Sequence, residues 1–152
     1  MLKSSLIYVE NAGRYLMLHR VSKLNDPNRD KWIGVGGKLE PGETPEACAR
    51  REMTEETGLT PLKMDYRGVV MFLSDKWPDE EMHLFTCPEF DGKLILCDEG
   101  ELEWVNKSDV PLLPIWEGDR IFLKLLAEDA PFFRLELRYE GETLAGWKMT
   151  EA

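Results

Sequence analysis

The chain has 152 residues and a formal net charge of −10, a length that predicts one domain over residues 1–152 with a core that needs no disulfides. This acidic balance lacks the basic face that binds long DNA or RNA. No apolar run reaches the roughly 18 residues of a membrane-spanning helix. We therefore expect neither long nucleic acid nor a membrane as a partner.

The N-terminal part predicts a β-hairpin followed by a loop. Residues 4–10 alternate between two faces and predict a strand, residues 11–13 a turn, and residues 14–20 the partner strand. Residues 21–31 are polar and predict a loop. Residues 32–39 contain three glycines and predict an extended segment in which the backbone approaches its neighbours closely.

The clearest helix signal follows a turn at residues 40–43. Thr44 is a suitable N-cap, Pro45 suits the first helical position, and Gly58 is the left-handed residue expected just after a helix. These signals predict a helix from residue 45 to about residue 57.

The second half predicts more strands and one more helix. Strands are expected at residues 66–74, 82–87, 93–96 and 102–105, and a helix at residues 115–128. Residues 132–139 and 143–149 predict a terminal hairpin. Mixed strands with two helices indicate an α/β fold of the sandwich type.

The three cysteines, Cys48, Cys87 and Cys97, are odd in number and lack the paired spacing of a zinc site. We interpret them as reduced, buried residues of a cytoplasmic protein. The sequence leaves the oligomeric state open between a monomer and a homodimer.

An acidic group lies on the predicted first helix. Glu52, Glu55 and Glu56 are spaced i, i+3 and i+4, so they share one narrow arc of the helix. Alone, this pattern is compatible with a solvated acidic face. The alternative is a cation site, because Mg²⁺ takes oxygen ligands and shares its remaining positions with water and substrate phosphates.

The residues around these glutamates favour the cation site. Gly37 is followed after five residues by Glu43, and seven residues later comes the run 51–59, Arg-Glu-Met-Thr-Glu-Glu-Thr-Gly-Leu. The spacing resembles the Nudix box at every defining position. Seven fixed identities, each with a frequency of roughly 7%, coincide by chance about once in 10⁸ windows.

The resemblance implies a fold and a metal site. Nudix domains are α/β/α sandwiches with a mixed β-sheet between helices. The metal is expected to be Mg²⁺, with Mn²⁺ as a substitute. Its implied ligands are the carbonyl of Gly36 and the carboxylates of Glu52, Glu55 and Glu56.

Further roles follow from the same resemblance. Glu43 and Arg51 resemble the ion pair that holds the loop against the helix, and Lys38 is placed to meet a phosphate. Metal ions neutralise a polyphosphate and acidify water, so that a carboxylate can take the proton. Glu52 is the first choice for that catalytic base and Glu55 the second.

Outside the box the chain resembles MutT-type 8-oxo-dGTP diphosphatases. The resemblance is carried by residues 31–38, by Glu99 with Trp104, and by residues 116–119. It implies that Glu99 completes the metal site, that Trp116 stacks on the purine and that Asp119 binds the base edge. An indole offers a stacking face and a carboxyl group pairs with purine donors.

Five more residues bear on the substrate pocket. Phe72, Trp77 and Met82 are candidates to line it, with plain core positions as the alternative. The animal enzymes have an amide side chain where this chain has Ile33, which leaves selectivity for oxidised guanine open. Arg20, at the end of the second strand, is a further candidate and is placed to approach phosphate. A plain surface position is an equal alternative for this residue.

Simpler interpretations stay open for the other pocket residues. Trp116 is compatible with a core residue at a helix start, Asp119 with a first-turn acid favoured by the helix dipole, and Glu99 with an ordinary loop acid.

Three functions follow from these patterns. The first is Mg²⁺-dependent hydrolysis of a nucleoside triphosphate, such as 8-oxo-dGTP, to the monophosphate and pyrophosphate. The second is hydrolysis of ADP-ribose or a dinucleoside polyphosphate. The third is a non-catalytic nucleotide-sensing module, which typically loses box carboxylates that this chain keeps.

Overall fold

The structure is a computed structural model that describes residues 1–20, 28, 30–95 and 100–151. Two α-helices are found in these residues, α1 (Pro45–Thr57) and α2 (Glu117–Ala127), with a short 3-10 turn η1 (Val110–Leu112). The strands of the same residues are β1 (Leu2–Asn11), β2 (Arg14–His19), β3 (Trp32–Ile33), β4 (Val35–Lys38), β5 (Leu59–Ser74), β6 (Glu80–Gly92), β7 (Glu101–Asn106), β8 (Phe133–Glu140) and β9 (Thr143–Glu151).

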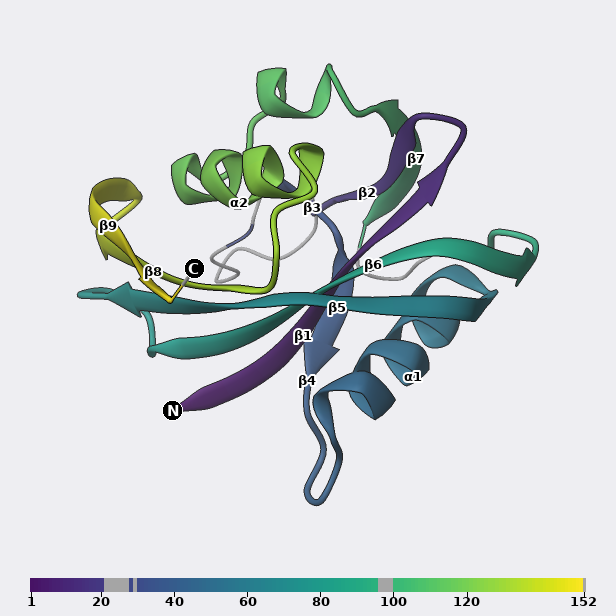
Figure 1. Cartoon of the computed structure of the whole chain (residues 1–152), viewed down its shortest axis with the longest axis horizontal. Helices are drawn as coiled ribbons and strands as arrows, with labels where there is room; N and C mark the ends of the chain where they lie inside the picture. The colour runs from purple at the N-terminus through teal and green to yellow at the C-terminus, as the bar shows by residue number, and fades with distance from the viewer. Residues whose placement is uncertain (21–27, 29, 96–99, 152) are drawn as a thin grey trace.

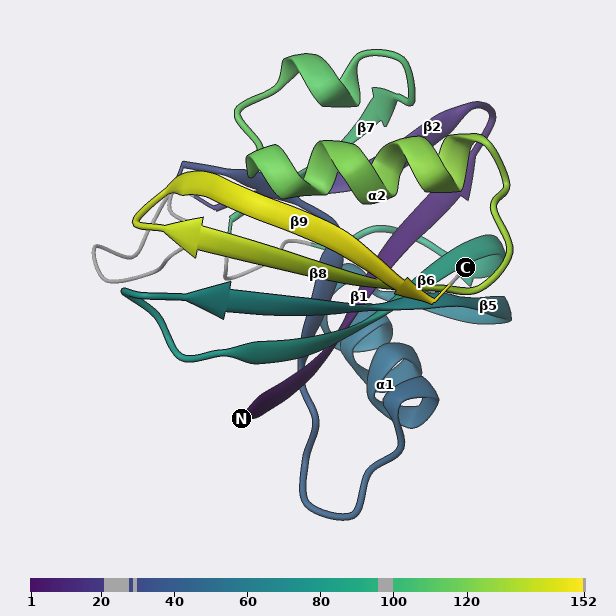
Figure 2. The ribbon, with the colours of Figure 1, turned by 60° about the vertical axis from the view of Figure 1, so that its left-hand side comes forward.

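The strands form one mixed sheet in the order β3-β2-β1-β6-β5-β8-β9, with β4 paired to β1 and β7 paired to β2. The pairs β1–β6 and β5–β8 are parallel, and the other pairs are antiparallel. Helix α1 lies against one face of the sheet and α2 against the other, as both views show (Figure 1, Figure 2). The expected α/β/α sandwich with a mixed sheet is confirmed.

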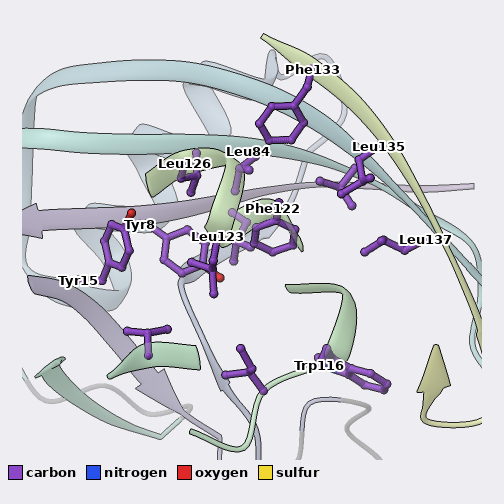
Figure 3. Close-up of a cluster of buried hydrophobic side chains, with 14 of the residues drawn as sticks. Tyr8, Tyr15, Leu84, Trp116, Phe122, Leu123, Leu126, Phe133, Leu135 and Leu137 are labelled. Atoms are coloured by element: carbon purple, nitrogen blue, oxygen red, sulfur yellow. The ribbon is translucent and has the colours of Figure 1, made fainter. Parts of the chain in front are cut away.

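Two apolar clusters hold the layers together. Because successive strand residues point to opposite faces, Leu6 and Tyr8 of β1 belong to the cluster beneath α2, while Ile7 and Val9 belong to the cluster beneath α1. The α2 cluster is rich in aromatic rings (Figure 3). The central strand β1 therefore fixes both helices relative to the same sheet.

Helix α1 begins and ends where its capping residues predict. The Thr44 side chain accepts a hydrogen bond from the Ala47 amide at 3.1 Å. Gly58 is left-handed, with φ of 78°, and its amide donates to the Thr54 carbonyl at 2.9 Å. The helix that carries the box carboxylates is thus fixed at both ends.

Strand β5 begins at Leu59 rather than at residue 66, and β6 runs to Gly92 rather than to residue 87, because the two strands pair from Leu59–Gly92 to Phe72–Glu80. Two further elements differ from expectation. Residues 93–95 form no strand, because the chain crosses the end of α1 there and the Ile95 amide donates to the Thr57 carbonyl at 2.9 Å; residue 96 lies outside the described residues. Helix α2 begins at Glu117 rather than at Ile115, because Trp116 is extended. The terminal hairpin β8–β9 is confirmed.

Cys48 and Cys87 are free and buried, as expected, while Cys97 lies outside the described residues. Neither helix in the described part of the chain is long and apolar enough to cross a bilayer.

Candidate functional site

A cavity of about 640 Å³ lies where β1, β4, α1, the β5–β6 turn and the start of α2 meet. It brings together most of the residues that the sequence singled out: Arg20, Gly36, Lys38, Glu52, Glu56, Phe72, Trp116 and Asp119. Ile33, Trp77 and Met82 also line it. Glu55 is not part of its wall, and Glu99 lies outside the described residues.

The glycines of β4 allow helix α1 to reach the cavity. A Cβ atom at Gly36 would lie 2.0 Å from the Ser5 carbonyl oxygen, and one at Gly37 would lie 2.5 Å from the carboxyl carbon of Glu52. Gly36 therefore excludes any side chain, because it meets backbone, whereas a side chain at Gly37 would displace the Glu52 carboxylate. The Gly36 amide donates a hydrogen bond to Glu56 Oε2 at 3.0 Å, which fixes that carboxylate beside the strand.

The three glutamates of α1 differ in exposure. Glu56 is 8% exposed and the Glu52 side chain 16% exposed, whereas the Glu55 side chain is 59% exposed. Glu52 and Glu56 are one helical turn apart, so both carboxylates reach the cavity beside β4. Glu55 points more to solvent.

Arg51 connects the loop before the helix to the acidic group. Its guanidinium donates to both carboxylate oxygens of Glu43, at 2.8 and 2.9 Å, and to Glu52 Oε1 at 2.8 Å. It also donates to Glu55 Oε2 at 3.2 Å. The hydrogen bonds from Arg51 lower the pKa of Glu43 to about 2. A two-pronged contact of this kind fixes geometry as well as charge.

The oxygen atoms at the α1 end of the cavity are of the type that binds a hard cation such as Mg²⁺. No group of three or more His, Cys, Asp or Glu side chains is arranged around a metal position in the described ranges. However, the carboxylates of Glu52 and Glu56 and the backbone of Gly36 line one cavity. Mg²⁺ uses one or two carboxylates and takes its other oxygens from water and substrate phosphates. These residues therefore fit a cation that a polyphosphate helps to hold.

Trp116 forms a fixed wall at the other end of the cavity. The residue is buried, and its indole Nε1 donates to Asn28 Oδ1 at 2.8 Å. Phe72 and Tyr139 pack edge-to-face on it, with ring centroids at 5.5 and 5.0 Å. Lys31 Nζ lies 5.0 Å from the ring centroid. These contacts hold the indole in one orientation.

Asp119 lies beside Trp116 on the first turn of α2. It is 5% exposed, and its carboxyl group has no hydrogen bond or ion pair with any residue that the structure describes. Burial raises its pKa to about 8, although the charges of Arg120 and Lys31 oppose the shift. Asp119 is therefore mostly protonated at neutral pH and offers both a donor and an acceptor.

Some cavity residues were not identified from the sequence. Asn28 fixes Trp116 from a point 88 residues earlier in the chain, and no local pattern marks that contact. Ser4 Oγ donates to Glu80 Oε2 at 2.5 Å on the cavity wall. Both contacts arise only when distant strands and loops come together.

Comparisons with known proteins find similar sequences over most of the chain. The family model described as NUDIX domain matches residues 3–126. The chain is 30% identical over 129 residues to an oxidized purine nucleoside triphosphate hydrolase of Danio rerio, covering 84% of this chain and 81% of that protein. It is also 39% identical over 112 residues to an ADP-ribose pyrophosphatase of Bacillus subtilis, covering 71% of this chain and 57% of that protein.

A solved structure extends the likeness to nearly the whole fold. The mutator MutT protein of Bacillus halodurans superposes with a TM-score of 0.88, at 24% identity, over 99% of this chain and 98% of that one. At this identity the likeness concerns the fold alone. It includes the β8–β9 hairpin, which lies beyond the residues matched by the family model.

Proposed function

Because the chain belongs to the Nudix hydrolase family, we propose that it hydrolyses a nucleoside triphosphate to the monophosphate and pyrophosphate, with 8-oxo-dGTP or a related oxidised purine nucleotide as substrate. One observation carries the proposal: a single cavity joins the carboxylates of Glu52 and Glu56 to the buried pair Trp116 and Asp119. The similarity to the oxidized purine nucleoside triphosphate hydrolase of Danio rerio supports the same substrate class.

Nudix hydrolases generally use a divalent metal, and the cation proposed here is Mg²⁺, with Mn²⁺ as a substitute. Its proposed ligands are Glu52, Glu56 and the Gly36 carbonyl, with Glu55 and Glu99 completing the set. When bound, it supplies positive charge that neutralises the polyphosphate and makes an attacking water more acidic. Glu55 needs a side-chain rotation away from Arg51 to join this set, since Arg51 now holds it near solvent.

The chain's own groups perform the remaining steps. Glu52 accepts a proton from the attacking water, whose oxygen forms a bond to phosphorus. The P–O bond between the α- and β-phosphoryl groups breaks, and its electron pair leaves on the departing group, which is pyrophosphate after attack on the α-phosphorus or the nucleoside monophosphate after attack on the β-phosphorus. Lys38 and Arg20 line the cavity and are proposed to bind phosphate oxygens. Arg51, paired with Glu43, holds the loop before α1 against the helix.

The buried end of the cavity is proposed to select the base. The indole of Trp116 offers a flat apolar surface, and a purine stacks on such a surface at low entropic cost. Neutral Asp119 would exchange hydrogen bonds with the purine edge, and a base without matching groups would leave Asp119 unpaired. The cytoplasm, where nucleotide pools lie, is the proposed location.

A substrate panel tests the proposal. The ratio kcat/KM is measured with Mg²⁺ for 8-oxo-dGTP, dGTP, ADP-ribose and diadenosine polyphosphates. We expect the highest value for 8-oxo-dGTP. Preference for ADP-ribose would contradict the proposal. It would favour the second candidate function, hydrolysis of ADP-ribose, which the similarity to the Bacillus subtilis ADP-ribose pyrophosphatase supports. Nucleotide binding without any hydrolysis would instead indicate a sensing module.

A further inference from the structure

Two buried polar side-chain atoms have no hydrogen-bond partner within the described residues: Tyr8 Oη and Trp77 Nε1. An unpaired buried donor costs free energy, so such an atom often marks a place where a missing group binds. Tyr8 belongs to the core beneath α2 (Figure 3) and is not among the residues that line the cavity. Trp77 does line the cavity. Of these two orphaned atoms, the covered indole nitrogen is the one whose side chain lines the ligand space.

The turn that carries Trp77 is held by specific hydrogen bonds. Ser74 Oγ accepts from the amides of Lys76 and Trp77, both at 3.0 Å, and Asp79 Oδ1 accepts from the Ser74 amide at 3.2 Å. Asp75 Oδ1 accepts from the Gly141 amide at 2.8 Å, which ties this turn to the β8–β9 turn. The fold therefore fixes where the indole meets the cavity.

The surroundings of Trp77 identify which part of a nucleotide it faces. Phe72 and Met82 line the same cavity from β5 and β6, and Phe72 packs edge-to-face on Trp116. These apolar side chains suit a nucleobase. The anionic end of a nucleotide is instead matched by Lys38 and by the cation site proposed at Glu52 and Glu56.

We propose that Trp77 is a second indole of the nucleobase subsite, and that its Nε1–H donates a hydrogen bond to a ring nitrogen or carbonyl oxygen of the bound purine. The proposal rests on the proposed function, because it takes a purine nucleotide as the ligand. The bound base satisfies the donor that the cavity wall leaves unpaired. Because the nitrogen is covered without ligand, the proposal requires the indole to turn toward the cavity when the base binds.

Trp77→Phe tests the hydrogen bond while keeping an aromatic wall. We expect binding of 8-oxo-dGMP, measured by calorimetry, to weaken about three- to tenfold, because a neutral hydrogen bond between buried groups is lost. KM for 8-oxo-dGTP should rise by a similar factor with kcat unchanged, since the contact is remote from the phosphates. Trp147→Phe, which changes an exposed indole on β9, is the matched control and should leave both values unchanged.

The outcomes separate this proposal from the proposed function. If wild-type protein hydrolyses 8-oxo-dGTP while Trp77→Phe binds and reacts like wild type, the role of Trp77 is wrong and the function stands. If wild-type protein binds 8-oxo-dGMP but hydrolyses no triphosphate, the function is wrong and the binding comparison still decides on Trp77. No binding by wild-type protein would overturn both. The variant Trp77→Leu removes the aromatic wall, and its melting temperature shows whether the fold is kept. Weaker binding at an unchanged melting temperature means that the wall, and not the fold, is lost.

Discussion

The two ends of the cavity use carboxyl groups in opposite ways. At the α1 end, called the charged end, Glu52 accepts from the Arg51 guanidinium and Glu56 accepts from the Gly36 amide. At the α2 end, Asp119 is buried, and its pKa rises to about 8. A charged carboxylate attracts a cation, whereas a neutral carboxyl group exchanges hydrogen bonds with a polar base. Environment, not residue type, therefore assigns the two roles.

The largest effect is expected at the charged end. Glu56→Gln should lower Mg²⁺-dependent kcat by at least about 10²–10³-fold, because a charged oxygen ligand is replaced by a neutral one. The fold should persist, since the amide oxygen still accepts from Gly36. Steady-state kinetics and circular dichroism measure the two effects.

Glu46→Gln is the control for this variant, because Glu46 lies on the first turn of the same helix and pairs with Arg50 at the surface. It should leave kcat unchanged. Near-normal turnover in Glu56→Gln would show that the comparison between the two ends is wrong.

A smaller effect is expected at the neutral end. Asp119→Ala should lower kcat/KM for purine triphosphates about 10- to 100-fold and reduce discrimination among bases, because the hydrogen bonds to the base edge are lost. Asp119→Asn keeps one donor and one acceptor and should lose less. If Asp119→Ala leaves base selectivity unchanged, Asp119 does not contact the base.

The raised pKa of Asp119 also predicts a pH dependence of stability. Between the usual Asp pKa of about 3.8 and the folded value of about 8, the folded state holds a proton that the unfolded state releases. Stability therefore falls as pH rises through this window. Asp119→Asn should gain in melting temperature relative to wild type at pH 8, and less at pH 5. An equal difference at both pH values would refute the buried, protonated carboxyl group.

The smallest effect concerns the pair that supports the charged end. Glu43→Gln should lower the melting temperature by a few degrees, because the charge-assisted contact with Arg51 is weakened. The pKa of Glu43 is lowered to about 2, so its contribution in wild type is present above about pH 4.5 and is lost as pH falls toward 2. Differential scanning calorimetry of both proteins at pH 7 and pH 3 measures this; an unchanged melting temperature at pH 7 would count against a structural role.

The charged end was largely predictable because its signals are local. Thr44, Pro45 and Gly58 define the helix by their own backbone and capping chemistry, and the spacing of Glu52 and Glu56 follows from the helical period. Which of the helix carboxylates line the cavity could not be predicted from local signals, because that depends on tertiary contacts. Arg51 holds Glu55 near solvent, and spacing alone does not reveal this.

The neutral end depends on contacts between distant residues. An acid in the first turn of a helix is compatible with full exposure, so the burial of Asp119 emerges only when α2 packs over the sheet. Asn28 and Trp116 meet across 88 residues. Residues 93–95 were predicted as strand from their composition, but their backbone follows the end of α1 instead.

The most direct measurement is calorimetric titration of Mn²⁺ into wild-type protein with a non-hydrolysable nucleoside triphosphate analogue, compared with the double variant Glu52→Gln/Glu56→Gln. We predict that wild type takes up the metal together with the nucleotide and that the double variant does not. Equal uptake by both proteins, or none by wild type, would contradict a cation held between these two carboxylates and a polyphosphate.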